Sequence, residues 1–111
     1  MTAFTRTRGD TYPDQIQVLS DATSDPVDIT GYSFLFTLDT DKAPTDSSTN
    51  VYQLTGNIVD AANGKVEFSP SAVQADLIGK YFFDIQMTDT AGKIRTIDKD
   101  KYTYTQDITK V

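Results

Sequence analysis

Short stretches of alternating apolar and polar residues, rich in β-branched and aromatic side chains, restrict the fold of this chain more than any other feature. Thr, Ile, Val, Tyr and Phe number 17, 8, 7, 6 and 6, which is 44 of the 111 residues. These side chains suit a pleated, half-buried surface and lose rotamer freedom in a helix. Every second residue is apolar in 32–38 and in 81–88, which predicts strands with one buried and one exposed face. The chain is therefore predicted to be all-β.

Residues that favour tight turns divide the chain at short intervals. Asn63-Gly64 predicts a hairpin because both residues tolerate positive φ, and the run 89–92 predicts another tight connection. The polar segment 39–50 is expected to form an exposed loop. We predict about seven antiparallel strands, at 3–8, 15–20, 32–38, 51–59, 64–69, 81–88 and 93–108, the last with a break near 98–100.

One segment departs from the strand pattern. Ser69 can cap a helix, Pro70 suits the first helical position and Gly79 suits the end. Val73 and Leu77 lie four residues apart, so both are expected to face the core. The segment predicts one short helix before the sixth strand, which at two turns is stable only when packed on the sheets.

The apolar positions that share one face of these elements form the predicted core. The length fits one domain, so residues 1–111 are expected to be a single unit. The predicted core residues are Ile16, Val18, Ile29, Phe34, Phe36, Leu38, Val66, Phe68, Leu77, Tyr81, Phe83, Ile85 and Met87.

Composition argues against several classes of function. The chain has no His and no Cys, which removes the commonest general base, the commonest metal ligand and cysteine nucleophiles. Its net charge of −6 argues against a nucleic-acid partner, which requires clustered Lys and Arg. No apolar run is long enough for a signal peptide or a membrane span, so we expect synthesis in a host cytoplasm and no membrane partner. No catalytic, cofactor or metal-binding residue is predicted, and the protein is expected not to be an enzyme.

Two motifs have both a specific and an ordinary interpretation. Residues 8–10 read Arg-Gly-Asp and match an integrin-binding tripeptide, but a glycine turn between two strand pieces explains them better. Asp39, Asp41 and Asp46 can gather around calcium, yet their spacing lacks the Gly and the closing Glu of an EF-hand loop. Solvated loop carboxylates are the preferred interpretation.

The number and spacing of strands suggest an immunoglobulin-like β-sandwich. Residues 76–83 (Asp-Leu-Ile-Gly-Lys-Tyr-Phe-Phe) resemble the tyrosine corner of such domains, in which a Tyr ring packs in the core and its hydroxyl bonds backbone a few residues upstream. The order of short motifs along the chain is also similar to the N-terminal domain of phage baseplate upper proteins and related immunoglobulin-like phage structural modules. The motifs are Arg-Gly-Asp-Thr at 8–11, Ile-Gln-Val-Leu at 16–19, Val-Asp-Ile-Thr-Gly at 27–31, Gly-Lys-Val-Glu-Phe at 64–68, Gly-Lys-Tyr-Phe-Phe-Asp-Ile at 79–85 and Thr-Ala-Gly-Lys-Ile at 90–94.

This resemblance implies a non-enzymatic structural module of a tailed phage or prophage virion, associated with its baseplate, tail or head. The implied partners are other virion proteins, and the implied state is a homo-oligomer within the assembled particle. The alternative is a carbohydrate- or cell-surface-binding module, against which the segment 39–50 offers no aromatic residue for a sugar to stack on.

Three residues are expected to form subunit contacts. Leu35 and Phe82 alternate with core positions on strands that are neighbours in an immunoglobulin-like order, so they are expected to share one external apolar patch. Phe4 lies on a first strand that can either pair within its own sheet or exchange onto a neighbouring subunit.

Overall fold

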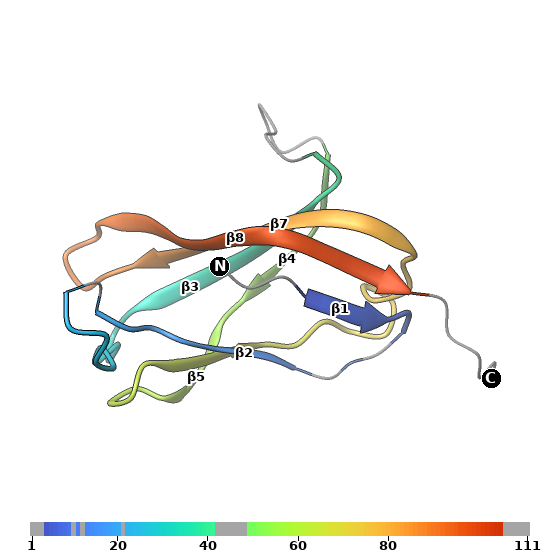
Figure 1. Ribbon diagram of the computed structural model, residues 1–111. Coiled ribbons are helices and arrows are strands. Elements are labelled where there is room, and N and C mark those ends of the chain that lie inside the picture. The colour runs from blue at the N-terminus through green and yellow to red at the C-terminus, as the bar shows by residue number, and fades with distance from the viewer. Residues whose placement is uncertain (1–3, 10, 12, 21, 42–48, 106–111) are drawn as a thin grey trace.

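The computed structural model describes residues 4–9, 11, 13–20, 22–41 and 49–105, and every structural statement below concerns this part of the chain. Two β-sheets pack face to face (Figure 1). The five-stranded sheet has the order β1-β8-β7-β3-β4, and the three-stranded sheet has the order β2-β6-β5. The strands are β1 (Phe4–Thr7), β2 (Asp14–Gln17), β3 (Ser33–Asp39), β4 (Asn50–Thr55), β5 (Asn57–Asp60), β6 (Lys65–Phe68), β7 (Gly79–Thr88) and β8 (Ile94–Thr105).

The all-β prediction is confirmed, but the strand count differs because Gly56 divides the strand expected at 51–59. β4 ends just before this glycine and β5 begins just after it, in the opposite sheet. A Cβ on Gly56 would lie 2.7 Å from the Cβ of Phe34 and 2.8 Å from a methyl of Val66, so only glycine lets the backbone pass so close to the core. The described chain therefore has eight strands where seven were expected.

Two further details of the predicted strands were wrong. β1 pairs with the C-terminal end of β8 in parallel, so the sheets are not wholly antiparallel. β8 also continues through residues 98–100 without the expected break. A bulge beside Ile97 absorbs one extra residue, and pairing with β7 then resumes at Asp98 and continues to Tyr104.

The predicted helix at 69–79 is not formed. Ser71, rather than Ser69, caps a single turn: its hydroxyl accepts from the backbone N–H of Gln74, whose side-chain oxygen accepts from the Ser71 N–H. The turn buries Ala75 and leaves Val73 87% exposed, so Val73 does not face the core. One turn without a continuous apolar face cannot propagate as a helix. No helix in the described residues is long and apolar enough to cross a membrane.

The two predicted turns are confirmed. Gly64 has φ +71° in the connection between β5 and β6, and a Cβ there would lie 2.7 Å from the carbonyl oxygen of Val18. Asp89 closes the turn between β7 and β8 by accepting hydrogen bonds from the backbone N–H groups of Ala91 and Lys93.

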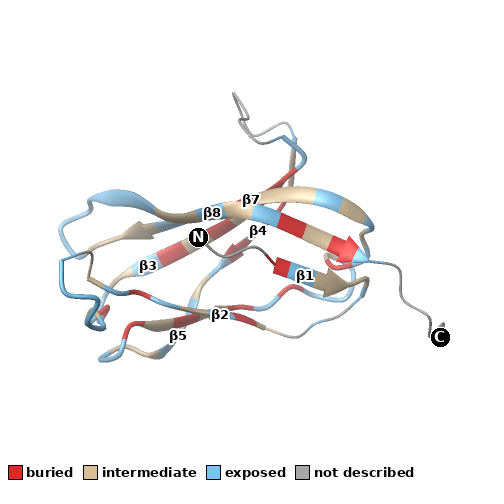
Figure 2. Cartoon of the chain, viewed as in Figure 1, coloured by how far each residue is buried: buried red, intermediate tan, exposed pale blue. Residues whose placement is uncertain are grey.

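The buried segments of the two sheets face each other (Figure 2). Aromatic rings dominate the core between them. Phe36 stands at its centre, with ring contacts to Phe68 in the other sheet and to Phe83 and Tyr102 in its own. All thirteen predicted core residues belong to this cluster, nine of them buried and Ile16, Leu77, Tyr81 and Met87 partly buried.

The hydrogen bond that was expected of Tyr81 is present. The hydroxyl of Tyr81 donates to the carbonyl oxygen of Ile78, three residues upstream, at 3.2 Å. The partly buried ring packs edge-on against Tyr104. This contact fixes the chain as it enters β7 from the turn at 71–77.

Candidate interaction site

Leu35 and Phe82 lie on the outer face of the five-stranded sheet, on the neighbouring strands β3 and β7. They are not opposite each other: Leu35 pairs with Gln86, and Phe82 pairs with Asp39. On the outer face, the pair Thr37–Asp84 lies between them. Both side chains are partly buried, and the register does not join them into the single patch that the alternation had suggested. Their roles as subunit contacts stay predictions.

Phe4 is buried within its own chain. β1 pairs in its own sheet, and the Phe4 ring packs against Phe83 and Tyr102 at centroid distances of 5.3 and 5.4 Å. The Arg6 guanidinium lies over the same ring at 5.1 Å. Phe4 can contact a partner only if β1 leaves this position.

Two carboxylates, Asp39 and Asp84, lie on the same outer face of the five-stranded sheet. Asp39 is 4% exposed, and its Oδ1 accepts from the backbone N–H of Asp41 and from the hydroxyl of Thr49. Burial raises the pKa of Asp84, Lys99 opposes this shift and Asp39 adds to it. Of the three residues considered for calcium, Asp46 lies outside the described residues, and no group of three possible ligands for a metal ion forms among the described ones.

Arg8 and Gly9 of the Arg-Gly-Asp motif form a turn after β1. Nε of Arg8 lies 2.5 Å from a carboxylate oxygen of Asp76, and Gly9 has φ +81° while its N–H donates to Ala75. The third residue, Asp10, lies outside the described residues. The Arg8 side chain is thus engaged within the chain, and Gly9 lies in the predicted turn.

A polar network is buried between the sheets. Asp14 on β2 is 2% exposed, and its carboxylate accepts from Nε of Arg6 at 2.6 Å and from the hydroxyl of Tyr102 at 2.5 Å. A terminal guanidinium nitrogen of Arg6 also contacts this carboxylate. Nearby, the hydroxyls of Tyr52 and Tyr104 lie 2.9 Å apart. The network joins β1, β2, β4 and β8.

The environment of these tyrosines favours their neutral form. Burial raises the pKa of Tyr102, and the hydrogen bond and negative charge of Asp14 raise it further. Burial also raises the pKa of Tyr52 and that of Tyr104. The Tyr102 hydroxyl therefore donates to Asp14, and of the Tyr52 and Tyr104 hydroxyls one donates to the other. This is a structural role and not an acid–base one.

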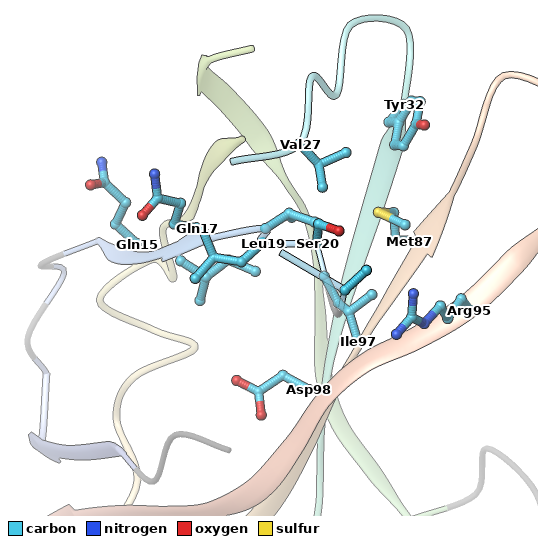
Figure 3. A pocket seen from close by; sticks show the side chains of 13 residues that line it. Gln15, Gln17, Leu19, Ser20, Val27, Tyr32, Met87, Arg95, Ile97 and Asp98 are labelled. Carbon is cyan, nitrogen blue, oxygen red and sulfur yellow. The ribbon is translucent and has the colours of Figure 1, made fainter. Parts of the chain in front are cut away.

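A pocket of about 690 Å³ lies between the two sheets of the described chain (Figure 3). One wall is β2 and the residues that follow it, 15–20. The opposite wall is the inner face of β7 and β8, where Met87, Arg95, Ile97 and Asp98 line the pocket. Val27 and Tyr32 close one end. The lining mixes apolar side chains with one cation and one anion.

Two strand edges border this pocket. β1 pairs with β8 at residues 102–105, and β1 is the outermost described strand of the larger sheet. β2 pairs with β6 alone and is the edge strand of the smaller sheet. Burial along β8 follows this division: Tyr102 and Tyr104 are buried, whereas residues 94–101 are exposed or partly buried (Figure 2).

The described fold is similar to two solved structures. The N-terminal domain of phage TP901-1 ORF48 matches with a TM-score of 0.58 at 14% identity, over 94% of this chain and 85% of that one. CopC from Methylosinus trichosporium OB3b matches with a TM-score of 0.55 at 11% identity, over 100% of this chain and 91% of that one. The sequence matches no protein-family model and no curated protein.

This chain has the fold of a phage protein domain. The resemblance inferred from the order of short motifs is confirmed at this level. Identities of 14% and 11% establish the fold alone, and CopC shows that the same fold occurs outside phages. The function must therefore be argued from the chain's own surfaces.

Proposed function

We propose that this protein is a non-enzymatic structural module of a tailed phage or prophage virion that acts through protein–protein contacts. The observation that carries the proposal is the match to the N-terminal domain of phage TP901-1 ORF48 over 94% of the chain, the domain type that the motif order independently suggested. Its place within the particle is the baseplate, the tail or the head, where repeated copies meet other virion proteins.

We infer that the fold is an immunoglobulin-like β-sandwich formed by a single domain. The smaller sheet, β2-β6-β5, has the order of strands B, E and D of such domains. The larger sheet contains β3, β7 and β8 in the order of strands C, F and G, extended by β4 and by β1. The tyrosine corner at Tyr81 stands at the start of the strand equivalent to F, where these domains place it.

Three features of the chain support contact over chemistry. The sequence has no His and no Cys for nucleophilic or acid–base work. Its most buried carboxylate, Asp14, is occupied by Arg6 and Tyr102. The described surface instead offers strand edges and a pocket between them, which are features that bind polypeptide.

The proposal is tested on purified particles. Phage induced from the bacterial strain that carries this gene is banded on a density gradient, and the proteins of the intact particles are quantified by mass spectrometry. We expect this chain in the band at a fixed integer ratio to a tail or capsid protein. Its absence from particles that contain all other structural proteins would refute the virion role.

The carbohydrate-binding alternative predicts a different result. A purified chain that binds a bacterial surface glycan saturably, and is missing from particles, would replace the proposed function with that alternative. Tyr52, near the start of β4, is 7% exposed and cannot stack on a sugar.

A further inference from the structure

We propose that the outer face of β7 and β8 binds a second copy of this chain, with a two-fold axis lying along the boundary between the two strands. These strands are neighbours in the five-stranded sheet, and their outer face is turned away from the smaller sheet (Figure 1). The inference names one partner for the proposed structural role, and it rests on that role only for where the dimer acts.

The outer face of these strands carries a regular pattern of charge. Phe83 is buried between the sheets, so Phe82 and Asp84 on either side of it point outward. Lys101 pairs with Phe82 in the cross-strand register, and residues directly opposite share a face. Lys99 pairs with Asp84 in the same way. The face therefore has two cations on β8 beside an aromatic ring and a carboxylate on β7.

These side chains have surface that a partner can cover. Lys99 and Lys101 are exposed. Phe82 and Asp84 are partly buried and keep part of their surface accessible. A second copy can therefore dock on this face without the displacement of any strand, unlike a contact through Phe4.

A two-fold axis along the strand boundary makes this face complementary to itself. The axis lies in the plane of contact and parallel to the strands, so it places β8 of one copy over β7 of the other with the rows in register. Lys99 of each copy then faces the partner's Asp84, which has the opposite charge. Lys101 faces the partner's Phe82, whose ring attracts a cation. Each contact occurs twice because the interface is isologous.

The charge pattern selects this orientation over the alternative. No row of β7 and β8 opposes like charges: Thr96 faces the partner's Gln86, and Thr103 faces the partner's Lys80. An axis running across the strands would instead place β8 over β8 and bring the lysines of the two copies together, which is repulsive. Antiparallel stacking of the two faces is thereby disfavoured.

Asp84 is the residue that gains most from a second cation. Burial raises the pKa of Asp84, Lys99 of the same chain lowers it and Asp39 raises it, and the pKa stays above its ordinary value. The carboxylate is therefore partly desolvated, and its charge is incompletely balanced within one chain. The partner's Lys99 would complete a network of two Lys and two Asp with alternating sign.

The size of the face fits a weak dimer. β7 has ten residues at ~3.3 Å each and the five strands lie ~4.8 Å apart, so the sheet offers on the order of 600 Å² per subunit. Specific interfaces bury about 800 Å² per partner. An interface of this size is expected to form at high protein concentration and to be strengthened where many copies are held together.

Charge reversal tests the arrangement. Asp84→Lys places Lys opposite Lys across the axis, and Lys99→Asp places Asp opposite Asp. We expect each variant alone to dimerise at least about tenfold more weakly than the wild type, measured by sedimentation equilibrium up to the solubility limit. Mixed in equal amounts, the two variants regain opposite charges at both contacts, and we expect a heterodimer.

The matched controls lie on the outer face of the smaller sheet. Glu67→Lys and Lys65→Asp change the net charge by the same amounts, and both residues point outward because Val66 and Phe68 of β6 are buried. These variants should dimerise like the wild type. Urea unfolding of each variant establishes that a monomeric variant is folded, and Asp84→Asn or Lys99→Gln replaces a reversal that does not fold.

Three results would overturn the proposal. The first is a wild-type chain that stays monomeric up to its solubility limit, including one that binds only another virion protein through this face. The second is a dimer that both charge reversals leave unchanged. The third is a mixture of the two folded variants that forms no heterodimer, because the two-fold pairing requires one.

The outcome is independent of the particle experiment. A dimer formed by a chain that is absent from virions would refute the phage role and leave the interface in place. A chain that is present in virions but does not dimerise would do the reverse.

Discussion

At the scale of single residues, Asp14 sets the strictest requirement in the molecule. A carboxylate that is 2% exposed is tolerated only when its charge is paired and its oxygens accept hydrogen bonds. Arg6 and Tyr102 supply both conditions from two other strands. A substitution of Arg6 or Tyr102 therefore removes a partner that the buried Asp14 requires.

The first prediction concerns this coupling. Tyr102→Phe keeps the ring but removes the donor to Asp14, and we expect a loss of about 1.5–3 kcal/mol in the free energy of unfolding, measured by urea denaturation. Tyr104→Phe is the control, because it removes a bond between two neutral hydroxyls and should cost about 0.5–1.5 kcal/mol. Equal losses in the two variants would mean that Asp14 does not depend on Tyr102.

The sequence revealed the apolar core but not this network. Period-two alternation identified the inward Phe, Ile and Leu positions because it depends only on neighbours along the strand. Asp14 sits in a polar stretch and looks like a surface residue, and its partner Tyr102 is 88 residues away. Tyr is apolar in its ring and polar at its tip, so alternation alone does not say whether the hydroxyl meets water or a buried acid.

At the scale of elements, the transfer of the chain from one sheet to the other depends on Gly56. Tyr52 and Leu54 before this residue and Ile58 after it all face inward, so the alternation continues through the corner without a change of phase. A single strand was therefore the natural prediction for 51–59. A helix was predicted where a single turn forms at 71–77. Its capping residues can be recognised from local sequence, but the burial that would stabilise a longer helix depends on distant parts of the chain.

The second prediction tests this corner. Gly56→Ala places a Cβ within 2.8 Å of both Phe34 and Val66, and we expect a loss of about 1–3 kcal/mol by thermal or urea unfolding. The matched control is Gly92→Ala, whose Cβ would meet no atom within 4 Å, although its φ of +81° adds local strain of about 1 kcal/mol. A Gly56 variant as stable as wild type would show that the corner can relax.

At the scale of the whole molecule, the outer face of the five-stranded sheet is mostly polar, with Leu35 and Phe82 as separate apolar points. The prediction that Leu35 and Phe82 lie on neighbouring strands is confirmed. The register between β3 and β7 could not be predicted, because these strands are far apart in the chain and no short turn joins them. The pocket could not be predicted from the sequence either. It lies between β2 of one sheet and β7 and β8 of the other, and the contact between these strands depends on how the two sheets pack.

The third prediction concerns association. If Phe82 is a subunit contact, Phe82→Thr should shift the sedimentation profile towards smaller species while the melting temperature falls by only a few degrees, since the residue is partly buried. Gln86→Thr, an exposed residue on the same face of β7, serves as the control and should leave the profile unchanged. Identical profiles for both variants would remove Phe82 from the interface.

The parallel ladder between β1 and β8 also dictates when the protein can mature during synthesis. Phe4 meets Tyr102, and these partners are separated by 102 − 4 = 98 positions. While a ribosome is still translating β8, the N-terminal strand and Arg6 wait without partners, and Asp14 has only water. The last native contacts can close only after β8 has left the ribosomal exit tunnel, so β1 is expected to stay unpaired while residues 8–101 are made, and this long-range pairing is expected to be a slow step of folding.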